Sequence, residues 1–330
     1  MGGAGCLGDW GAINSPLGVF FVIILFMLLA FKLLFLLFPE TVLLSARSGL
    51  LLWFNNVLPA LLPFAVISNI FIGSGLARTL GQKLSPVMRF VFGLPGAGGF
   101  AFIVGLTSGY PLGAKAVADL HAQQEINTKE AQHLLAFCNN AGPIFILGTI
   151  GVGMFMNRQL GYVLWIGHVL SALVLGVVIR AFVPGTASPS VLQMLKTPKQ
   201  DSPSINIHLG DAVKKAMETM VVIGGMIIFF SVVTGILGEI GLPDTGFAAG
   251  LFSGIVEVTG GVQKISVLGK GFIPVIIAAF LIAFGGLSIH MQALHFLSKT
   301  SVNKAVYFSH KLLHGLLAAV ITSLLYYFVV

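Results

Sequence analysis

Residues 95–120 read PGAGGFAFIVGLTSGYPLGAKAVADL, and this stretch decides the predicted fold. An apolar run of about a dozen residues is interrupted by Ser-Gly-Tyr-Pro at 108–111, and a second short apolar run follows. A helix needs about 20 apolar residues to cross a bilayer, so neither arm is long enough to cross alone. The pattern predicts a re-entrant hairpin, in which two short helices enter the membrane and return to the same side.

The composition places this hairpin in a membrane protein. The chain has 330 residues, of which 56% are hydrophobic and only 9% are charged, whereas water-soluble domains carry about 25% charged residues. Lys and Arg outnumber Asp and Glu by 18 to 11, yet the longest basic run is Lys214-Lys215 and no aromatic residues are interleaved with basic ones. We therefore expect an all-α polytopic membrane protein in a lipid bilayer, with basic cytoplasmic loops and no nucleic-acid partner.

A second kind of break follows the hairpin. The polar loop HAQQEINTKE at 121–130 precedes a helix that we expect to begin with Thr128 as its N-cap and to run through Phe137. The sequence Asn-Asn-Ala-Gly-Pro at 139–143 then interrupts the helix before the apolar run IFILGTIGVGMF. Irregular backbone at membrane depth survives only where protein buries it or where it lines a wet cavity. This broken span therefore indicates an internal site.

The same parts return in the second half of the chain. A crossing at 217–237 precedes FAAGLFSGIVEVTGGVQKISV at 247–267, which again has two short arms around a glycine-rich break. The letters GLTSG at 105–109 match GLFSG at 250–254, an offset of 145 residues. Phe137 at the first broken span corresponds to Phe284 in FGGLSIHMQAL, an offset of 147 residues. Two landmarks at nearly the same offset predict an internal repeat.

The repeat predicts the organisation of the chain. Each half contributes three crossings, an odd number, so we expect the second half to lie upside down relative to the first. The predicted parts are an N-terminal span plus an interfacial helix (1–54), a first repeat (55–183), a cytoplasmic linker (184–208) and a second, inverted repeat (209–330). With the N-terminus inside, 13 of the 18 Lys and Arg residues, Lys311 among them, fall on the cytoplasmic side, as the positive-inside rule requires.

Four breaks in a two-fold pattern predict one central site. Their half-helix N-termini would present free N–H groups and a positive dipole end to a carboxylate or phosphate. Lys115 would face an anionic ligand, and Glu257 would carry a proton or help to hold a sodium ion. The predicted substrate-binding residues are Ser108, Tyr110, Lys115, Asn139, Asn140, Glu257, Thr259, Ser288, His290 and Gln292.

Each assignment has a structural alternative. Glycines four residues apart, such as Gly105 and Gly109, also allow helices to pack closely. Lys115 would instead extend toward the cytoplasm, Glu257 would pair internally, and His290 would be a satisfied core residue. His310 and His314 share a helix face, but no cysteine or carboxylate accompanies them in the sequence, so we predict no metal site.

Enzyme motifs are lacking. No HExxH, Walker loop or GxSxG on a strand-turn-helix pattern occurs. We therefore expect neither an enzyme nor a cofactor, and transport would be driven by a gradient of protons or sodium ions, or be facilitated.

Seven sequence blocks, in order, resemble the YlbJ family of sporulation integral membrane proteins, also called stage V sporulation protein V, within the nucleoside-recognition or Gate-domain superfamily. They include SARSGLLLWFNNVLPALLPF, GLTSGYPLGAKAV, LLAFCNNAGPIFILG and FGGLSIHMQ. The resemblance runs from about Ser45 to the C-terminus. It implies two Gate-like repeats and a fold similar to that of concentrative nucleoside transporters.

The resemblance also implies a function and a location. Members act in endospore-forming bacteria, in the mother cell, moving dipicolinic acid across the outer forespore membrane. The expected partner is a small anionic aromatic substrate, with Lys115 and half-helix N-termini complementing its carboxylates and Tyr110 stacking on its ring. A nucleoside-like substrate and a non-transporting scaffold for spore maturation are the alternatives, and a homo-oligomer is allowed.

Overall fold

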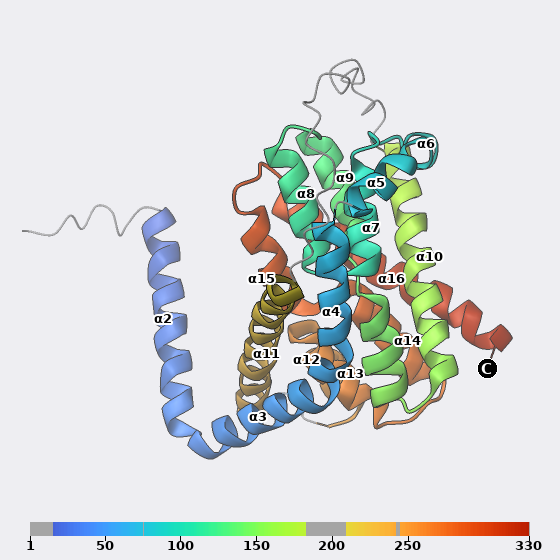
Figure 1. Ribbon diagram of the computed structural model, residues 1–330. Helices are drawn as coiled ribbons and strands as arrows, with labels where there is room; N and C mark the ends of the chain where they lie inside the picture. Colours follow the sequence, from blue (N-terminus) through green and yellow to red (C-terminus); the bar gives the residue numbers. More distant parts are fainter. Residues whose placement is uncertain (1–15, 75, 183–208, 242–244, 330) are drawn as a thin grey trace, which may run out of the picture.

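The computed structural model describes residues 16–329 except 75, 183–208 and 242–244 (Figure 1). The predicted linker at 184–208 lies outside the described residues. Within the described ranges every regular element is helical. Up to residue 182 these are α2 (Pro16–Leu37), α3 (Pro39–Leu52), η1 (Trp53–Val57), α4 (Leu58–Gly73), α5 (Leu76–Lys83), α6 (Ser85–Val87), η2 (Met88–Phe92), α7 (Gly98–Thr107), α8 (Leu112–Ala122), α9 (Thr128–Cys138), η3 (Phe145–Met154) and α10 (Arg158–Phe182). From residue 209 they are α11 (Leu209–Glu239), α12 (Gly246–Val256), α13 (Val258–Ser266), α14 (Phe272–Phe284), α15 (Gly286–Leu297) and α16 (Lys304–Val329).

The predicted integral membrane class is confirmed. In the part of the chain that the structure describes, five stretches are long and apolar enough to cross a membrane. They are Pro39–Phe71, Arg158–Phe182, Leu209–Glu239, Phe272–Leu297 and Lys304–Phe328. In Figure 1 most helices of the chain form one bundle. Helix α2 stands apart from this bundle and is connected to it through α3.

The helix breaks fall close to their predicted positions. Helices α7 and α8 pack against each other around the interruption at 108–111, and α12 and α13 pack around Glu257. The second hairpin turns three to four residues later than the GLFSG match implies, because Ser253 and Gly254 are still inside α12. Helix α9 ends at Cys138 before η3 begins at Phe145, and α14 ends at Phe284 before Gly285, which has a φ of 93°.

Glycines serve both predicted purposes. A Cβ on Gly105 or on Gly113 would collide with the carbonyl oxygen of Cys138, so α7 and α8 approach the end of α9 through glycines. Gly109 instead takes a left-handed φ of 76° at the turn of the hairpin. Packing glycines and turn glycines therefore alternate within one motif.

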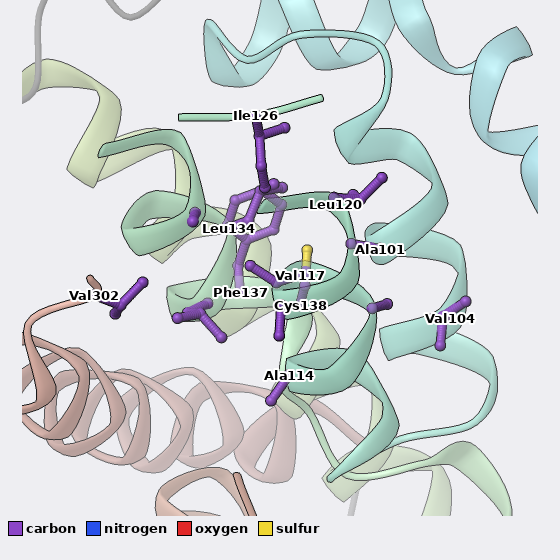
Figure 2. Packing of buried hydrophobic residues seen from close by; sticks show 14 of the residues in the cluster. Ala101, Val104, Ala114, Val117, Leu120, Ile126, Leu134, Phe137, Cys138 and Val302 are labelled. Atoms are coloured by element: carbon purple, nitrogen blue, oxygen red, sulfur yellow. The ribbon is translucent and has the colours of Figure 1, made fainter. Parts of the chain in front are cut away.

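A hydrophobic cluster fixes α7, α8 and α9 to one another (Figure 2). Val104, Val117 and Leu134 contribute to it from these three helices, and Phe137 stacks on Phe92 with ring centroids 4.5 Å apart. The buried cluster anchors the first hairpin beside the first broken span, which places their two interruptions together.

The structure corrects two details of the predicted helices. Asn127, and not Thr128, is the N-cap of α9: its Oδ1 accepts from the backbone N of Glu130 at 3.0 Å, while its own N donates to Glu130 Oε2 at 2.8 Å. This capping box leaves Thr128 as the first helical residue. Lys311, counted among the cytoplasmic charges, is 1% exposed within α16.

The predicted interfacial helix packs along α11. Thr41 Oγ1 on α3 donates to Glu239 Oε1 at 2.5 Å, and Asn69 Nδ2 on α4 donates to the carbonyl oxygen of Ala212 at 3.1 Å. The continuous α3, η1 and α4 therefore run antiparallel to α11 over most of its length. The interfacial position itself stays a prediction.

Candidate functional site

A central cavity lies where the four helix breaks meet. Ser108 and Tyr110 line it from the first hairpin, Gly142 from the first broken span, Glu257 from the second hairpin and Ser288 from the first turn of α15. Helices α4 and α11 complete the wall with apolar side chains, including Phe64, Ile223 and Met226. Six of the ten predicted site residues line this cavity, namely Ser108, Tyr110, Glu257, Thr259, Ser288 and Gln292.

The cavity contains polar atoms that no protein group satisfies. The hydroxyls of Ser108, Tyr110 and Ser288 and Oε1 of Gln292 are buried and have no hydrogen-bond partner among the described residues. An unpaired polar group in an apolar interior costs roughly 1–3 kcal/mol. Buried polar groups usually have a partner, and these four of the fifteen unpartnered buried atoms in the described residues come from both halves of the chain, which makes the cavity a candidate site for a polar ligand.

Glu257 caps the second half of its hairpin. Its Oε1 accepts from the backbone N of Thr259 at 2.9 Å, and its Oε2 accepts from the backbone N of Gly260 at 2.6 Å. The carboxylate therefore occupies the N-terminus of α13, which the sequence predicted to be free for a ligand. It is 4% exposed and also lines the cavity, so it combines the predicted structural role with a position beside any bound solute.

Three other half-helix N-termini at the breaks have no side-chain cap, and in one of them, that of η3, the backbone N–H groups of Phe145 and Ile146 already donate to the carbonyl oxygen of Gly142. Helix α8 begins after Pro111, and α15 begins after Gly285; neither of these N-cap residues offers a side-chain hydrogen bond. Their first-turn N–H groups carry the positive end of the helix dipole. The backbone N of Gly113 in α8 already donates to the carbonyl oxygen of Gly109 at 3.2 Å, so the other first-turn N–H groups of α8 and those of α15 are the candidate donors for an anionic group.

Asn139, Asn140 and His290 lie behind the cavity. The backbone N of Tyr110 donates to the carbonyl oxygen of Asn140 at 2.5 Å, which ties the hairpin to the broken span. Asn139 Nδ2 donates to the hydroxyl of Tyr307 at 2.9 Å, and His290 Nδ1 lies 3.3 Å from the same hydroxyl. These three predicted residues support the wall of the cavity, and none of them lines it.

Lys115 lies in a second, wider cavity. Its Nζ pairs with Asp119 Oδ2 at 2.6 Å, and the two side chains are 46% and 48% exposed. Lys215 and Glu218 also line this space, which offers about 960 Å³ to the centres of water-sized molecules, against about 70 Å³ in the central cavity. The predicted alternative for Lys115, a cation reaching toward the aqueous side, is compatible with this position.

The two cavities adjoin. They share five lining residues, which are Leu112, Thr219, Ile223, Met226 and Gln292. The shared wall runs from the start of α8 across α11 to α15. The wide cavity with its mixed charges therefore lies directly beside the narrower central one.

One buried ionisable residue near the site was missed from the sequence. Lys311 Nζ donates to the carbonyl oxygen of Asn139 at 2.8 Å and lies 3.1 Å from His314 Nδ1. The available signal was a lysine seven residues after the start of a predominantly apolar helix of 26 residues, between His310 and His314, since an ionisable residue at membrane depth is a functional candidate by default.

The fold and cavity together define a multi-spanning helical membrane protein built around an internal polar site. A family model described as "Nucleoside recognition", the Gate family, matches residues 54–140. The chain is 33% identical over 319 residues to the sporulation integral membrane protein YlbJ of Bacillus subtilis (strain 168), covering 87% of this chain and 78% of that protein. It belongs to the YlbJ family of sporulation integral membrane proteins. No solved structure matches it.

Proposed function

We propose that the chain is a secondary transporter or facilitator that binds dipicolinic acid, a small aromatic dicarboxylate, in the central cavity and moves it across the outer forespore membrane during sporulation. The observation that carries the proposal is the set of four unpartnered buried polar atoms on Ser108, Tyr110, Ser288 and Gln292. A bound solute would form hydrogen bonds with these atoms, and water would take its place after release.

The cavity offers groups suited to each part of this substrate. The Tyr110 ring lies at the cavity wall for stacking against a pyridine ring. The uncapped N-termini of α8 and α15 supply backbone donors for carboxylates. The adjoining wide cavity has Lys115 and Lys215 on its wall, balanced by Asp119 and Glu218, so its two cations would contact an anion locally without a net positive field.

Glu257 implies a coupling cation. A dicarboxylate in the central cavity would stand beside this buried carboxylate, and two like charges in a low-dielectric space repel strongly. We propose that a proton or a sodium ion binds at Glu257 together with the substrate. The bound cation would then partly neutralise the negative charge of the dicarboxylate each time the substrate crosses the membrane.

The proposed mechanism uses an inverted repeat, similar to that of concentrative nucleoside transporters. The order of elements supports it, since a long helix, a hairpin, a broken span and another long helix occur in α4–α10 and again in α11–α16. In such designs two halves rock about a fixed midplane site. The central cavity, to which both hairpins contribute, would be that site.

A nucleoside-like solute is the second candidate. No Lys or Arg is among the residues that line the central cavity in the described part of the chain, and neutral donors and acceptors suit a neutral solute. The Gate family's description points the same way. The experiment must therefore separate a dicarboxylate from a nucleoside.

Uptake of radiolabelled dipicolinate into proteoliposomes tests the proposal. Wild-type protein is compared with Tyr110→Phe, Glu257→Gln and the matched control Tyr162→Phe, whose hydroxyl lies at an exposed position beside Arg158. Dipicolinate is supported as the substrate if its uptake by the wild type is saturable and excess unlabelled uridine does not reduce it. Tyr110→Phe and Glu257→Gln should then reduce this uptake, and Tyr162→Phe should not. Uptake of uridine in its place supports the second candidate. Folded protein that transports neither solute, under a proton or a sodium gradient, contradicts both and favours a scaffold.

A further inference from the structure

Lys311 is a buried basic residue that has no role in the proposed transport step. Its side chain projects from α16 into the bundle and is 1% exposed. Among the described residues no carboxylate forms an ion pair with it. Burying an ammonium group without a carboxylate partner is costly, so a charged Lys311 needs another compensating partner.

The compensating partner is the end of a broken helix. Nζ donates to the carbonyl oxygen of Asn139, the C-cap residue of α9. The last carbonyl groups of a helix carry the negative end of its dipole and lack partners within the helix. In membrane carriers such half-helix C-terminal ends and unwound carbonyls are where coupling cations bind.

Neighbouring hydrogen bonds orient the lysine. His314 Nε2 lies 3.3 Å from the carbonyl oxygen of His168, to which it can only donate, so its Nδ1 is free to accept from Lys311 Nζ. His168 Nε2 in turn accepts from the backbone N of Ala141 at 3.1 Å. The cluster thus holds both sides of the break at 139–144, using side chains from α10 and α16.

We propose that the ammonium group of Lys311 serves as a resident cation at the C-terminal end of α9, where it holds the break and, through it, positions Tyr110 in the central cavity. The link is short, because Asn140 follows Asn139 and its carbonyl oxygen accepts from the backbone N of Tyr110. Lys311 is thus a positioning residue, and its effect on transport rests on the proposed function. Its effect on the backbone at the break does not depend on transport and can be measured separately.

Hydrogen exchange measured by mass spectrometry tests the local effect in Lys311→Ala protein. Peptides covering 105–115 and 138–146 should exchange at least several-fold faster than in the wild type. Ethylammonium, which fits the space vacated by the side chain and donates hydrogen bonds, should restore slow exchange, and tetramethylammonium at equal ionic strength should not. Lys311→Met, which keeps the chain volume without the charge, should exchange fast and resist rescue.

Lys270→Ala is the matched control, because Lys270 also donates to a backbone carbonyl, that of Met156, but from an exposed position. It should leave exchange at 105–146 unchanged with either amine. Slow exchange in both Lys311 variants, or equal recovery with tetramethylammonium, would overturn the inference. If the wild type transports no solute, the proposed function fails and the exchange data still decide the role of Lys311. If the wild type transports, Lys311→Ala should raise KM, and ethylammonium should lower it again.

Discussion

The backbone N–H of Tyr110 donates to the carbonyl oxygen of Asn140 at 2.5 Å. This hydrogen bond joins the turn of the first hairpin to the break of the neighbouring span, at the point where both approach the cavity. Gly109 and Gly142 make the contact possible, since a Cβ on Gly109 would lie 2.5 Å from the backbone N of Gly142. The two interruptions therefore form one structural unit, and its integrity can be tested.

Gly109→Ala should destabilise the protein. The left-handed backbone costs an L-residue about 1–2 kcal/mol, and the collision with Gly142 adds to that cost. The expected result is a lower thermal unfolding midpoint in detergent. The control is Gly225→Ala in α11, where nothing lies within 4 Å of the added Cβ. That change should be neutral or stabilise by about 0.5–1 kcal/mol, and equal midpoints for the two variants would contradict the prediction.

Asn127→Ala should cost more stability than Thr128→Ala. Asn127 makes the reciprocal capping contacts with Glu130, whereas the Thr128 hydroxyl contacts the Ser301 hydroxyl at 2.8 Å. Loss of an N-cap costs about 0.5–2 kcal/mol. Unfolding midpoints of the two variants decide between the cap found in the structure and the one expected from the sequence, and a larger loss for Thr128→Ala would favour the latter.

Glu257→Ala and Glu257→Gln should separate capping from coupling. Alanine removes both hydrogen bonds to the start of α13, with an expected loss of about 0.5–2 kcal/mol. Glutamine keeps one acceptor oxygen, so its stability loss should be smaller. Under the proposed function, both variants should lose gradient-driven uptake. Glu40→Gln, which alters an exposed carboxylate in the first turn of α3, is the control. Full driven uptake by Glu257→Gln would exclude Glu257 as the coupling site.

Lys115→Ala should change the entry of an anionic substrate more than its binding. The exposed pair with Asp119 is worth about 0–1 kcal/mol, so the unfolding midpoint should hardly move. Uptake at saturating dipicolinate should persist, while the half-saturating concentration rises at low salt and approaches the wild-type value at high salt. The double variant Lys115→Ala/Asp119→Ala restores the net charge and should recover much of the loss. Abolished uptake at all salt concentrations would instead make Lys115 a direct ligand.

The breaks were predictable because their causes are local. Glycine, proline and paired asparagines interrupt a helix by their own backbone preferences, as at 108–111 and 139–143. The predicted break after Phe284 was accurate for the same reason, since Gly285 takes a left-handed conformation at the end of α14. The N-cap of α9 was missed by one residue, because Asn127 and Thr128 are both good caps and only the position of Glu130 selects between them.

The polar side chains were harder to assign. Tyr110 and Asn140 are hydrogen-bonded neighbours through their backbones, yet Tyr110 lines the cavity and Asn140 lies behind it. Lys115 follows Pro111 by one helical turn and lines the wide cavity. Which way a side chain faces depends on the rotation of its helix against its neighbours, and hydropathy does not encode that rotation.

The sequence by itself determined the class of protein, the helical segments and the places where they break, because hydrophobic length and backbone preference act within a few residues of one another. Only the tertiary structure decided which polar groups share a cavity and which charges are buried. Lys311 illustrates the difference: its neighbours in sequence suggested a cytoplasmic surface, while its partner Asn139 comes from a helix 172 residues away. Segments so distant in sequence meet only when the helices pack together in the folded protein. That packing places Lys311 Nζ at the end of a broken helix.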